Sequence, residues 1–206
     1  MRINKLSPSR HKEGRWLICL ENGDLLRVGE NEVLSFSLYA GMDMDDETLE
    51  ALKEAAESAK HKEYALNLLS ARPLSRAELV RKLEEKECPE EAAQAIADRL
   101  EELGYLDDAA YARALAGHYS AKGYGPYKIR DELCRRGVPR EYWEEALAGQ
   151  EDRTERIDAF VAQKLRNIPQ PDRKDLKRVS DALARRGFSW SDISAALGRY
   201  GAGMEE

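Results

Sequence analysis

Basic side chains recur fifty residues apart in segments 126–136 and 172–186, and cations grouped in this way could bind phosphate groups or an acidic protein surface. At about 100° per residue they fall opposite the apolar stripe of each predicted helix. They are Lys128 and Arg135 in the first segment and Lys174, Arg178 and Arg185 in the second. The recurrence makes this face the first candidate for a binding surface.

The same two surface places hold Glu78 and Glu85 a further fifty residues upstream. The repeated position is therefore basic twice and acidic once. The alternative is a solvated helix face of mixed charge, which is what a single basic helix usually is.

Further contact candidates surround these helices: Lys122, Arg130, Arg136, Arg186, Tyr124 and Tyr127. Arg136 and Arg186 end predicted helices, where a cation also offsets the helix dipole, so a structural role is open for both. Tyr124 and Tyr127 flank a turn broken by Gly123 and Gly125, and exposed aromatic rings could stack on bases.

The sequence contains no recognisable catalytic or metal-binding motif. His11, His61 and His118 are isolated, and the HExxH, GxSxG and CxxC patterns are absent. Segment 123–126, Gly-Tyr-Gly-Pro, lacks the Gly-Lys-Ser/Thr ending of a phosphate-binding loop. We therefore expect a protein that is not an enzyme and needs no cofactor or metal ion.

Composition and charge limit the setting. The three cysteines are widely spaced, no apolar run approaches the roughly 20 residues of a membrane span, and no apolar block follows the N-terminus. We expect a cytoplasmic monomer without membrane contact. The net charge is −6, but residues 1–120 hold 16 Lys and Arg against 24 Asp and Glu, whereas residues 121–206 hold 17 against 15. An anionic partner would therefore meet the C-terminal half.

The first 45 residues predict a small β-hairpin. Arg15–Glu21 and Asp24–Gly29 are short apolar-rich runs, and Asn22-Gly23 between them suits a type I′ turn. Segment Glu32–Tyr39 alternates in polarity and predicts a third strand.

Helical periodicity and helix-capping residues predict nine helices after residue 45. Their expected bounds are Thr48–Ser70, Ser75–Glu87, Pro89–Leu103, Asp107–Ala121, Pro126–Arg136, Pro139–Ala148, Glu151–Arg166, Asp172–Arg186 and Ser189–Gly198. Capping boxes open two of them, Ser75 with Glu78 and Ser189 with Asp192.

The nine helices form three sets of three at an offset of fifty residues. Leu83, Leu133 and Leu183 coincide, as do Ala65, Leu115 and Leu165, and the turns that follow the middle helices also align. Because one such unit cannot bury its own apolar face, the units should stack. The expected fold is mainly α, with three tandem three-helix repeats in an elongated, curved array and an N-terminal β-hairpin. The expected parts are residues 1–45, 46–104, 105–149, 150–200 and a tail, 201–206.

The second repeat resembles the RecX family of recombinase regulators. The resemblance rests on Leu103-Gly104-Tyr105-Leu106-Asp107-Asp108, Tyr111-Ala112, Lys122-Gly123, Ile129, Glu132-Leu133 and Arg136-Gly137-Val138. Like residues stand in the first repeat, including Leu68-Leu69, Glu78-Leu79 and Lys82-Leu83. The sequence departs from the family at Glu87, where a glycine is usual, and in its more divergent third repeat, with its linker 169–171.

The resemblance implies three tandem three-helix units that bind RecA, and in particular the RecA filament on single-stranded DNA, and modulate RecA activity, usually by lowering it. A weak direct contact with DNA fits this expectation. The alternative is a nucleic-acid-binding helical protein that acts without RecA, suggested by the helix–turn–helix pattern of 129–148.

Overall fold

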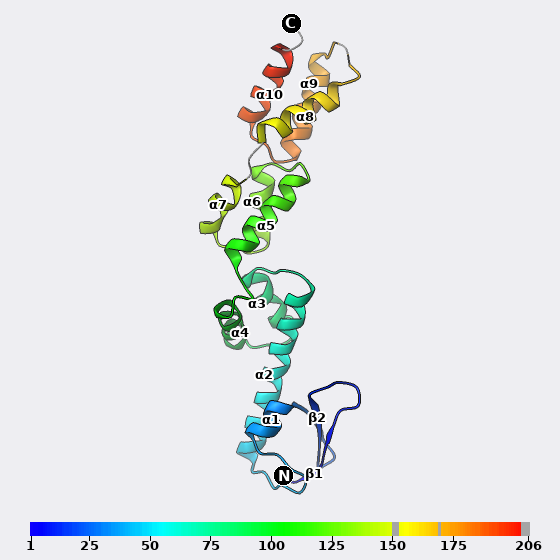
Figure 1. Ribbon diagram of the computed structural model, residues 1–206, viewed down its shortest axis with the longest axis vertical. Coiled ribbons are helices and arrows are strands. Elements are labelled where there is room, and N and C mark those ends of the chain that lie inside the picture. The colour runs from blue at the N-terminus through cyan, green and yellow to red at the C-terminus, as the bar shows by residue number, and fades with distance from the viewer. Residues whose placement is uncertain (150–152, 169, 203–206) are drawn as a thin grey trace. The chain divides into compact units, whose positions relative to one another are not determined.

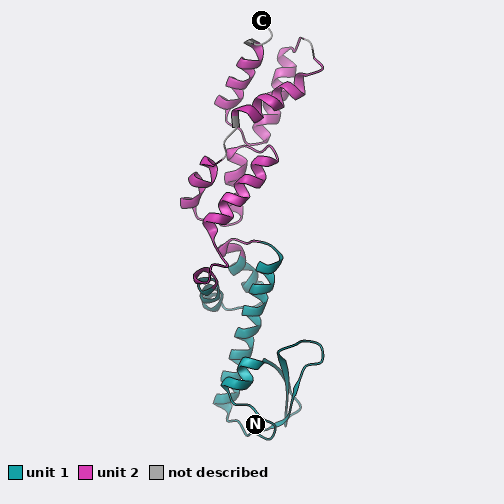
Figure 2. Cartoon of the chain, in the orientation of Figure 1, with its two compact units in different colours: residues 1–72, 79–99 teal, residues 73–78, 100–206 magenta. Residues whose placement is uncertain are grey.

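The computed structural model describes residues 1–149, 153–168 and 170–202 and is mainly helical (Figure 1). Two compact units divide the chain: residues 1–72 with 79–99, and residues 73–78 with the segment from 100 onward (Figure 2). No helix within the described residues is long and apolar enough to cross a membrane.

A three-stranded antiparallel sheet and a short helix open the chain. The sheet has the order β1-β2-β3, with β1 at Ile3–Pro8, β2 at Arg15–Leu20 and β3 at Leu25–Gly29, and α1 (Glu30–Ser35) follows. One face of the sheet is buried against α2 (Asp46–Ala71). The buried side chains of this core include Ile3, Ile18, Leu20, Val28, Leu49 and Leu52.

The predicted hairpin of β2 and β3 is confirmed, but the prediction of a type I′ turn between them is wrong. Gly23 has φ +92°, whereas Asn22 lacks the positive φ that a type I′ turn needs at both central residues. The Gly23 N–H donates to the Leu20 carbonyl (3.0 Å) and the Leu20 N–H to the Asp24 carbonyl (2.9 Å). This is a three-residue loop with a left-handed glycine at its end.

The predicted third strand at Glu32–Tyr39 is also wrong, because most of that segment forms α1 or the turn after it. The Gly29 N–H donates to the Glu32 carboxylate at 2.8 Å. This helix cap starts a helix even though polar and apolar residues alternate in the segment that follows. The third strand is β1, whose register shifts between Ile3 and Lys5. That irregularity breaks the alternation by which a strand is recognised.

The remaining helices form the expected sets of three. The first set is α2, α3 (Arg76–Glu84) and α4 (Glu90–Glu102); the second is α5 (Asp108–Ala121), α6 (Pro126–Arg135) and α7 (Trp143–Ala148); the third is α8 (Arg153–Leu165), α9 (Arg173–Arg185) and α10 (Trp190–Ala202). The segment predicted as the helix Pro139–Ala148 begins with a 3₁₀ turn, η1 (Arg140–Tyr142), before α7. The predicted start at Glu151, the linker residue Pro169 and tail residues 203–206 lie outside the described residues.

The repeat of the core is confirmed. Leu83, Leu133 and Leu183 are each 0% exposed, and Ala65, Leu115 and Leu165 are buried as well. One continuous apolar cluster joins α5, α6 and α7, and another joins α8, α9 and α10. The fifty-residue period therefore describes packing and not only composition.

A left-handed residue follows the middle helix of every set. Glu87, Gly137 and Gly187 have φ values of +63°, +70° and +87°. A side chain at Gly137 would collide with Ala77, and one at Gly187 with the backbone of Lys128, so both positions need glycine. Glu87 adopts the same backbone geometry with a full side chain, which is unfavourable for an L-residue.

We predict that Glu87→Gly raises the free energy of unfolding by about 1 kcal/mol, because glycine removes the cost of the left-handed backbone. Urea unfolding followed by circular dichroism measures the change. The matched control is Glu85→Gly in the same turn, where φ is not positive and glycine should lower stability by about 0.5–1 kcal/mol. Equal effects of the two substitutions would contradict the strain at Glu87.

Candidate binding surface on the middle helices

Three equivalent positions on the middle helices, or in the turn directly after, carry a different charge pattern in each repeat. They are Glu78, Lys82 and Glu85 in the first repeat, Lys128, Glu132 and Arg135 in the second, and Arg178, Ala182 and Arg185 in the third. The second repeat has the opposite sign of charge at each of the three positions. The third repeat keeps the two outer cations of the second but has no carboxylate between them. The charge available to a partner therefore differs among the repeats.

On α6 the candidate cations hold a buried carboxylate. Glu132 is 8% exposed; the Arg135 Nε donates to its Oε2 at 3.0 Å, and the Lys128 Nζ lies 4.0 Å from its Oε1. Burial alone would raise the pKa of Glu132, but the hydrogen bond and charge of Arg135 outweigh it and lower the pKa. Lys128 and Arg135 therefore have two roles: they keep the buried Glu132 ionised, and they face solvent themselves.

On α9 the candidate cations form fewer ion pairs than those on α6. Lys174, Arg178 and Arg185 are exposed, and Ala182 stands where the second repeat has Glu132. The Arg178 side chain is 68% exposed and its Nη1 lies 3.3 Å from Asp175. Lys174 and Arg185 form no ion pair with any residue of the described chain. The face of α9 is therefore the best candidate for an anionic partner.

The candidates around α6 have separate surroundings. Arg130 forms an ion pair with Glu144 at 2.9 Å, whereas Lys122 is exposed and unpaired within the described ranges. Tyr127 is 56% exposed, but Tyr124 is half-buried with its ring centroid 5.6 Å from that of Tyr119. Of the two tyrosines, Tyr127 is the one that can offer a ring to a partner.

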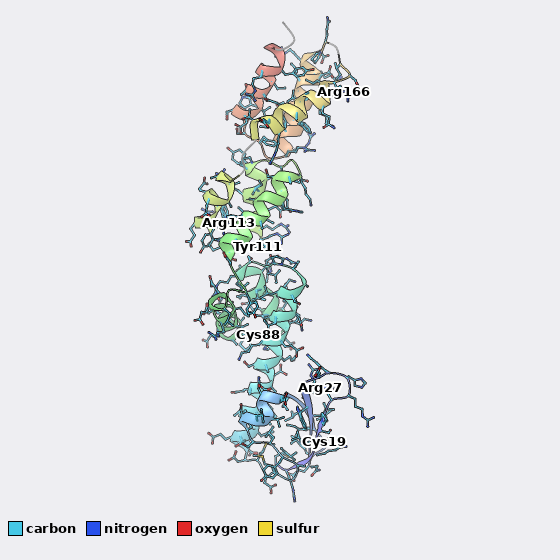
Figure 3. All side chains as sticks on the ribbon, in the orientation of Figure 1. Cys19, Arg27, Cys88, Tyr111, Arg113 and Arg166 are labelled. Carbon is cyan, nitrogen blue, oxygen red and sulfur yellow. The ribbon has the colours of Figure 1, made fainter. Side chains whose placement is uncertain are left out.

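Arg136 faces inward. Its Nη1 donates to both Glu78 carboxylate oxygens (3.2 and 3.3 Å) and to the Tyr111 hydroxyl (2.8 Å). The Tyr111 hydroxyl in turn donates to Glu78 at 2.8 Å, and the Ser75 hydroxyl donates to the Arg136 carbonyl (Tyr111 is labelled in Figure 3). We call this set of four residues the first joint; all of it lies in the second unit.

The first joint corrects one expectation. Glu78 was expected on the surface like its counterparts Lys128 and Arg178, but it is 6% exposed. Burial and the hydrogen bond to Glu78 raise the pKa of Tyr111 to about 12. One residue could have indicated this burial: Tyr111 lies at core spacing, and a buried tyrosine hydroxyl requires a polar partner.

The second joint lies fifty residues further along the chain. The Gly125 N–H donates to the Arg186 carbonyl (2.8 Å) and the Tyr127 N–H to the Gly187 carbonyl (3.0 Å). The Arg186 Nη1 donates to the Gly123 carbonyl at 3.2 Å, and its guanidinium lies 4.6 Å from the centroid of the Phe160 ring. Because Lys128 replaces Glu78 here, Arg186 finds a carbonyl and a ring instead of a carboxylate.

This architecture places the chain in the class of proteins built from tandem three-helix repeats. The first, second and third three-helix domains of RecX match residues 62–100, 107–147 and 150–197. The chain is 39% identical over 133 residues to the regulatory protein RecX of Xanthomonas citri, covering 64% of this chain and 82% of that one. The chain belongs to the RecX family.

Other relatives extend the match. The regulatory protein RecX of Limosilactobacillus reuteri (strain DSM 20016) is 29% identical, covering 92% of this chain and 73% of its own, so the similarity reaches the N-terminal part. A crystal structure of a regulatory protein RecX has a TM-score of 0.74 at 27% identity and covers 96% of this chain and 98% of that one. RecX from Lactobacillus salivarius, at 23% identity and a TM-score of 0.65 over 70% of this chain and 97% of its own, shares the fold. The relatives are named as regulatory proteins, in agreement with the prediction that the chain is not an enzyme.

We predict that Tyr111→Phe lowers the free energy of unfolding by about 1–2 kcal/mol at pH 8, because Glu78 loses a buried hydrogen-bond donor. The raised pKa also sets a pH dependence. The stability that Tyr111 contributes is complete below about pH 10, the pKa of an unfolded tyrosine, and is lost as the pH rises through about 12.

The stability difference between the parent and Tyr111→Phe should therefore shrink between pH 8 and pH 12 in urea unfolding. Tyr105→Phe, at a tyrosine that is 60% exposed, is the control and should change stability little at either pH. A Tyr111→Phe protein as stable as the parent at pH 8 would show that the Tyr111 hydroxyl contributes nothing to the stability of the first joint.

Proposed function

We propose that this chain binds RecA and its filament on single-stranded DNA and lowers the ATP hydrolysis and strand exchange that the filament performs. The observation that carries the proposal is the succession of three RecX domains across residues 62–197. Regulation without catalysis requires a binding surface and no converging reactive groups. Within the described residues, no group of three or more His, Cys, Asp or Glu is placed to hold a metal ion.

The cations of α9 supply the binding surface in this proposal. Lys174, Arg178 and Arg185 are exposed on one helix, and within the described part of the chain Asp175 is the only carboxylate that pairs with any of them. Such cations can face acidic side chains of RecA or the phosphates of its DNA. Lys128 and Arg135 contribute less, because their charge is partly neutralised by Glu132.

Direct nucleic-acid binding without RecA is the second candidate. The observation in its favour is Tyr127, an exposed ring that precedes Lys128 and follows Lys122 by five residues; Lys122 is exposed and has no ion pair among the described residues. The net charge of −6 disfavours it. Titrating single- and double-stranded DNA at several salt concentrations separates the two functions, because tight binding with a steep salt dependence in the absence of RecA would favour the second.

The proposal predicts that substoichiometric amounts of this protein lower RecA ATP hydrolysis on single-stranded DNA, and that the triple variant Lys174→Glu, Arg178→Glu, Arg185→Glu loses most of this effect. The expected shift in the half-inhibitory concentration is at least about tenfold, because three attractive contacts become repulsive. The ATPase assay with titrated protein measures both.

The matched control reverses three exposed cations in the first unit, Lys5, Arg10 and Lys62, and so gives the same net charge. The control should inhibit like the parent. Inhibition by a folded α9 variant at the parental concentration would exclude this face. No effect of the parent protein on RecA would exclude the proposed function.

A further inference from the structure

The open edge of β3 is a row of backbone groups without partners. β3 is the last strand of the sheet, and the bond from the Leu20 N–H to the Asp24 carbonyl fixes the phase of its pairing with β2. In an antiparallel pair, alternate residues bond across the pair. Leu26 and Val28 therefore bond β2, and the N–H and C=O groups of Leu25 and Arg27 point to the open edge, where no residue of the described chain bonds them.

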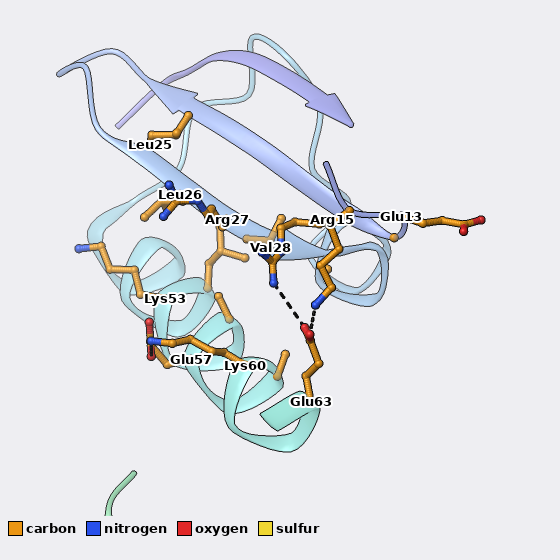
Figure 4. Close-up of a pocket in the computed structure, with 16 residues that line it drawn as sticks. Glu13, Arg15, Leu25, Leu26, Arg27, Val28, Lys53, Glu57, Lys60 and Glu63 are labelled. Carbon is orange, nitrogen blue, oxygen red and sulfur yellow. Dashed lines mark hydrogen bonds and ion pairs between the residues drawn. The ribbon is translucent and has the colours of Figure 1, made fainter. Parts of the chain in front are cut away.

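A hollow of about 710 Å³ lies along this edge, between β3 and α2 (Figure 4). All five residues of β3 line it on one side, and residues of α2 from Leu52 to Glu63 line it on the other. The partly buried Leu26 and Ala56 give it an apolar floor, whereas Leu25, next to Leu26 on the strand, points to the opposite face of the sheet and is 47% exposed. The hollow is long enough on the β3 side to accept an extended segment beside the strand.

Positive charge predominates around the hollow. Its walls carry the cations Lys12, Arg15, Arg27, Lys53 and Lys60 against the carboxylates Glu13, Glu57 and Glu63. Glu63 is held by Lys12 and by Arg15 (3.4 Å), and Glu57 by Lys60 (2.8 Å). Arg27 is exposed and forms no ion pair among the described residues (Figure 3).

The sheet is positively charged, whereas the chain as a whole is negatively charged. β1, β2 and β3 contain three cations and no carboxylate, in a protein with a net charge of −6. The residues that line the hollow include no aromatic side chain, so bases of a nucleic acid would find nothing on which to stack. An apolar floor, a basic rim and an unpaired strand edge together fit a protein segment.

We propose that the open edge of β3 binds an extended acidic segment of a partner protein, which adds a fourth strand to the sheet. Backbone bonds to Leu25 and Arg27 align the segment, its apolar side chains reach the floor, and its carboxylates meet Arg27 and the neighbouring cations. This site lies in the N-terminal unit and is independent of the cations on α9.

The test titrates the full-length protein with a synthetic peptide of alternating Glu and Val, up to about 1 mM, a concentration that reveals weak binding. Backbone amide shifts in NMR spectra and calorimetry report the binding. The expected result is shifts at Leu25, Arg27 and the facing part of α2. The same peptide with a central proline, and one of alternating Lys and Val, should bind at least about tenfold more weakly.

Two variants separate the charge from the backbone pairing. Arg27→Glu should lower the affinity about tenfold, whereas Lys5→Glu, the same charge change on β1, should not. Leu25→Pro removes an outward N–H but no bond to β2, so it should fold and lose binding; if it does not fold, the proline-containing peptide tests the same bond. Absence of binding at 1 mM, binding unchanged in Arg27→Glu, or equal shifts on adding oligo-dT would overturn the proposal.

Discussion

A helix that ends inside a protein leaves carbonyl groups that need hydrogen-bond donors, and the repeats satisfy this need in each other. The carbonyl of Arg136 accepts from the Ser75 hydroxyl, and the carbonyl of Arg186 accepts from the Gly125 N–H, fifty residues on. Both contacts require the chain to turn sharply just after the helix, which is why Gly137 and Gly187 leave no room for a side chain. The left-handed turn is therefore part of how consecutive repeats join as well as part of how a helix stops.

The joints also decide which charges remain available to a partner. Position 78 and its equivalent 128 both lie in a joint, but one holds a buried carboxylate and the other a lysine. Glu78 draws Arg136 inward, together with Tyr111. Without such a carboxylate, Arg186 rests on Phe160 and a carbonyl. A cation at a repeated position can thus serve the fold in one repeat and face solvent in the next.

The periodicity of the sequence predicted most of the fold because the core repeats with the chain. Leu83, Leu133 and Leu183 could be aligned from leucine spacing and turn residues alone, and all three are fully buried. The errors arose where a specific contact, near or distant in sequence, overrode the polarity pattern of the segment. Alternation suggested a strand at Glu32–Tyr39, but a cap between Gly29 and Glu32 starts a helix there. Surface spacing placed Glu78 in solvent, and only the partners 33 and 58 residues away, Tyr111 and Arg136, explain its burial.

The cations beside the open edge of β3 also relate to backbone N–H and C=O groups that lack hydrogen-bond partners. An exposed strand edge tends to pair with further chains, and proteins commonly protect such edges with charge. Cations on both sides of the β3 edge repel a second copy of that edge, because the copy brings the same Arg27 and Arg15. They do not repel an acidic strand, for which the same charges become attractive. A single arrangement of residues therefore disfavours self-association and favours a partner of opposite charge. The partly buried Leu26 and Ala56 beside the edge add the apolar contact that charge protection alone would not require.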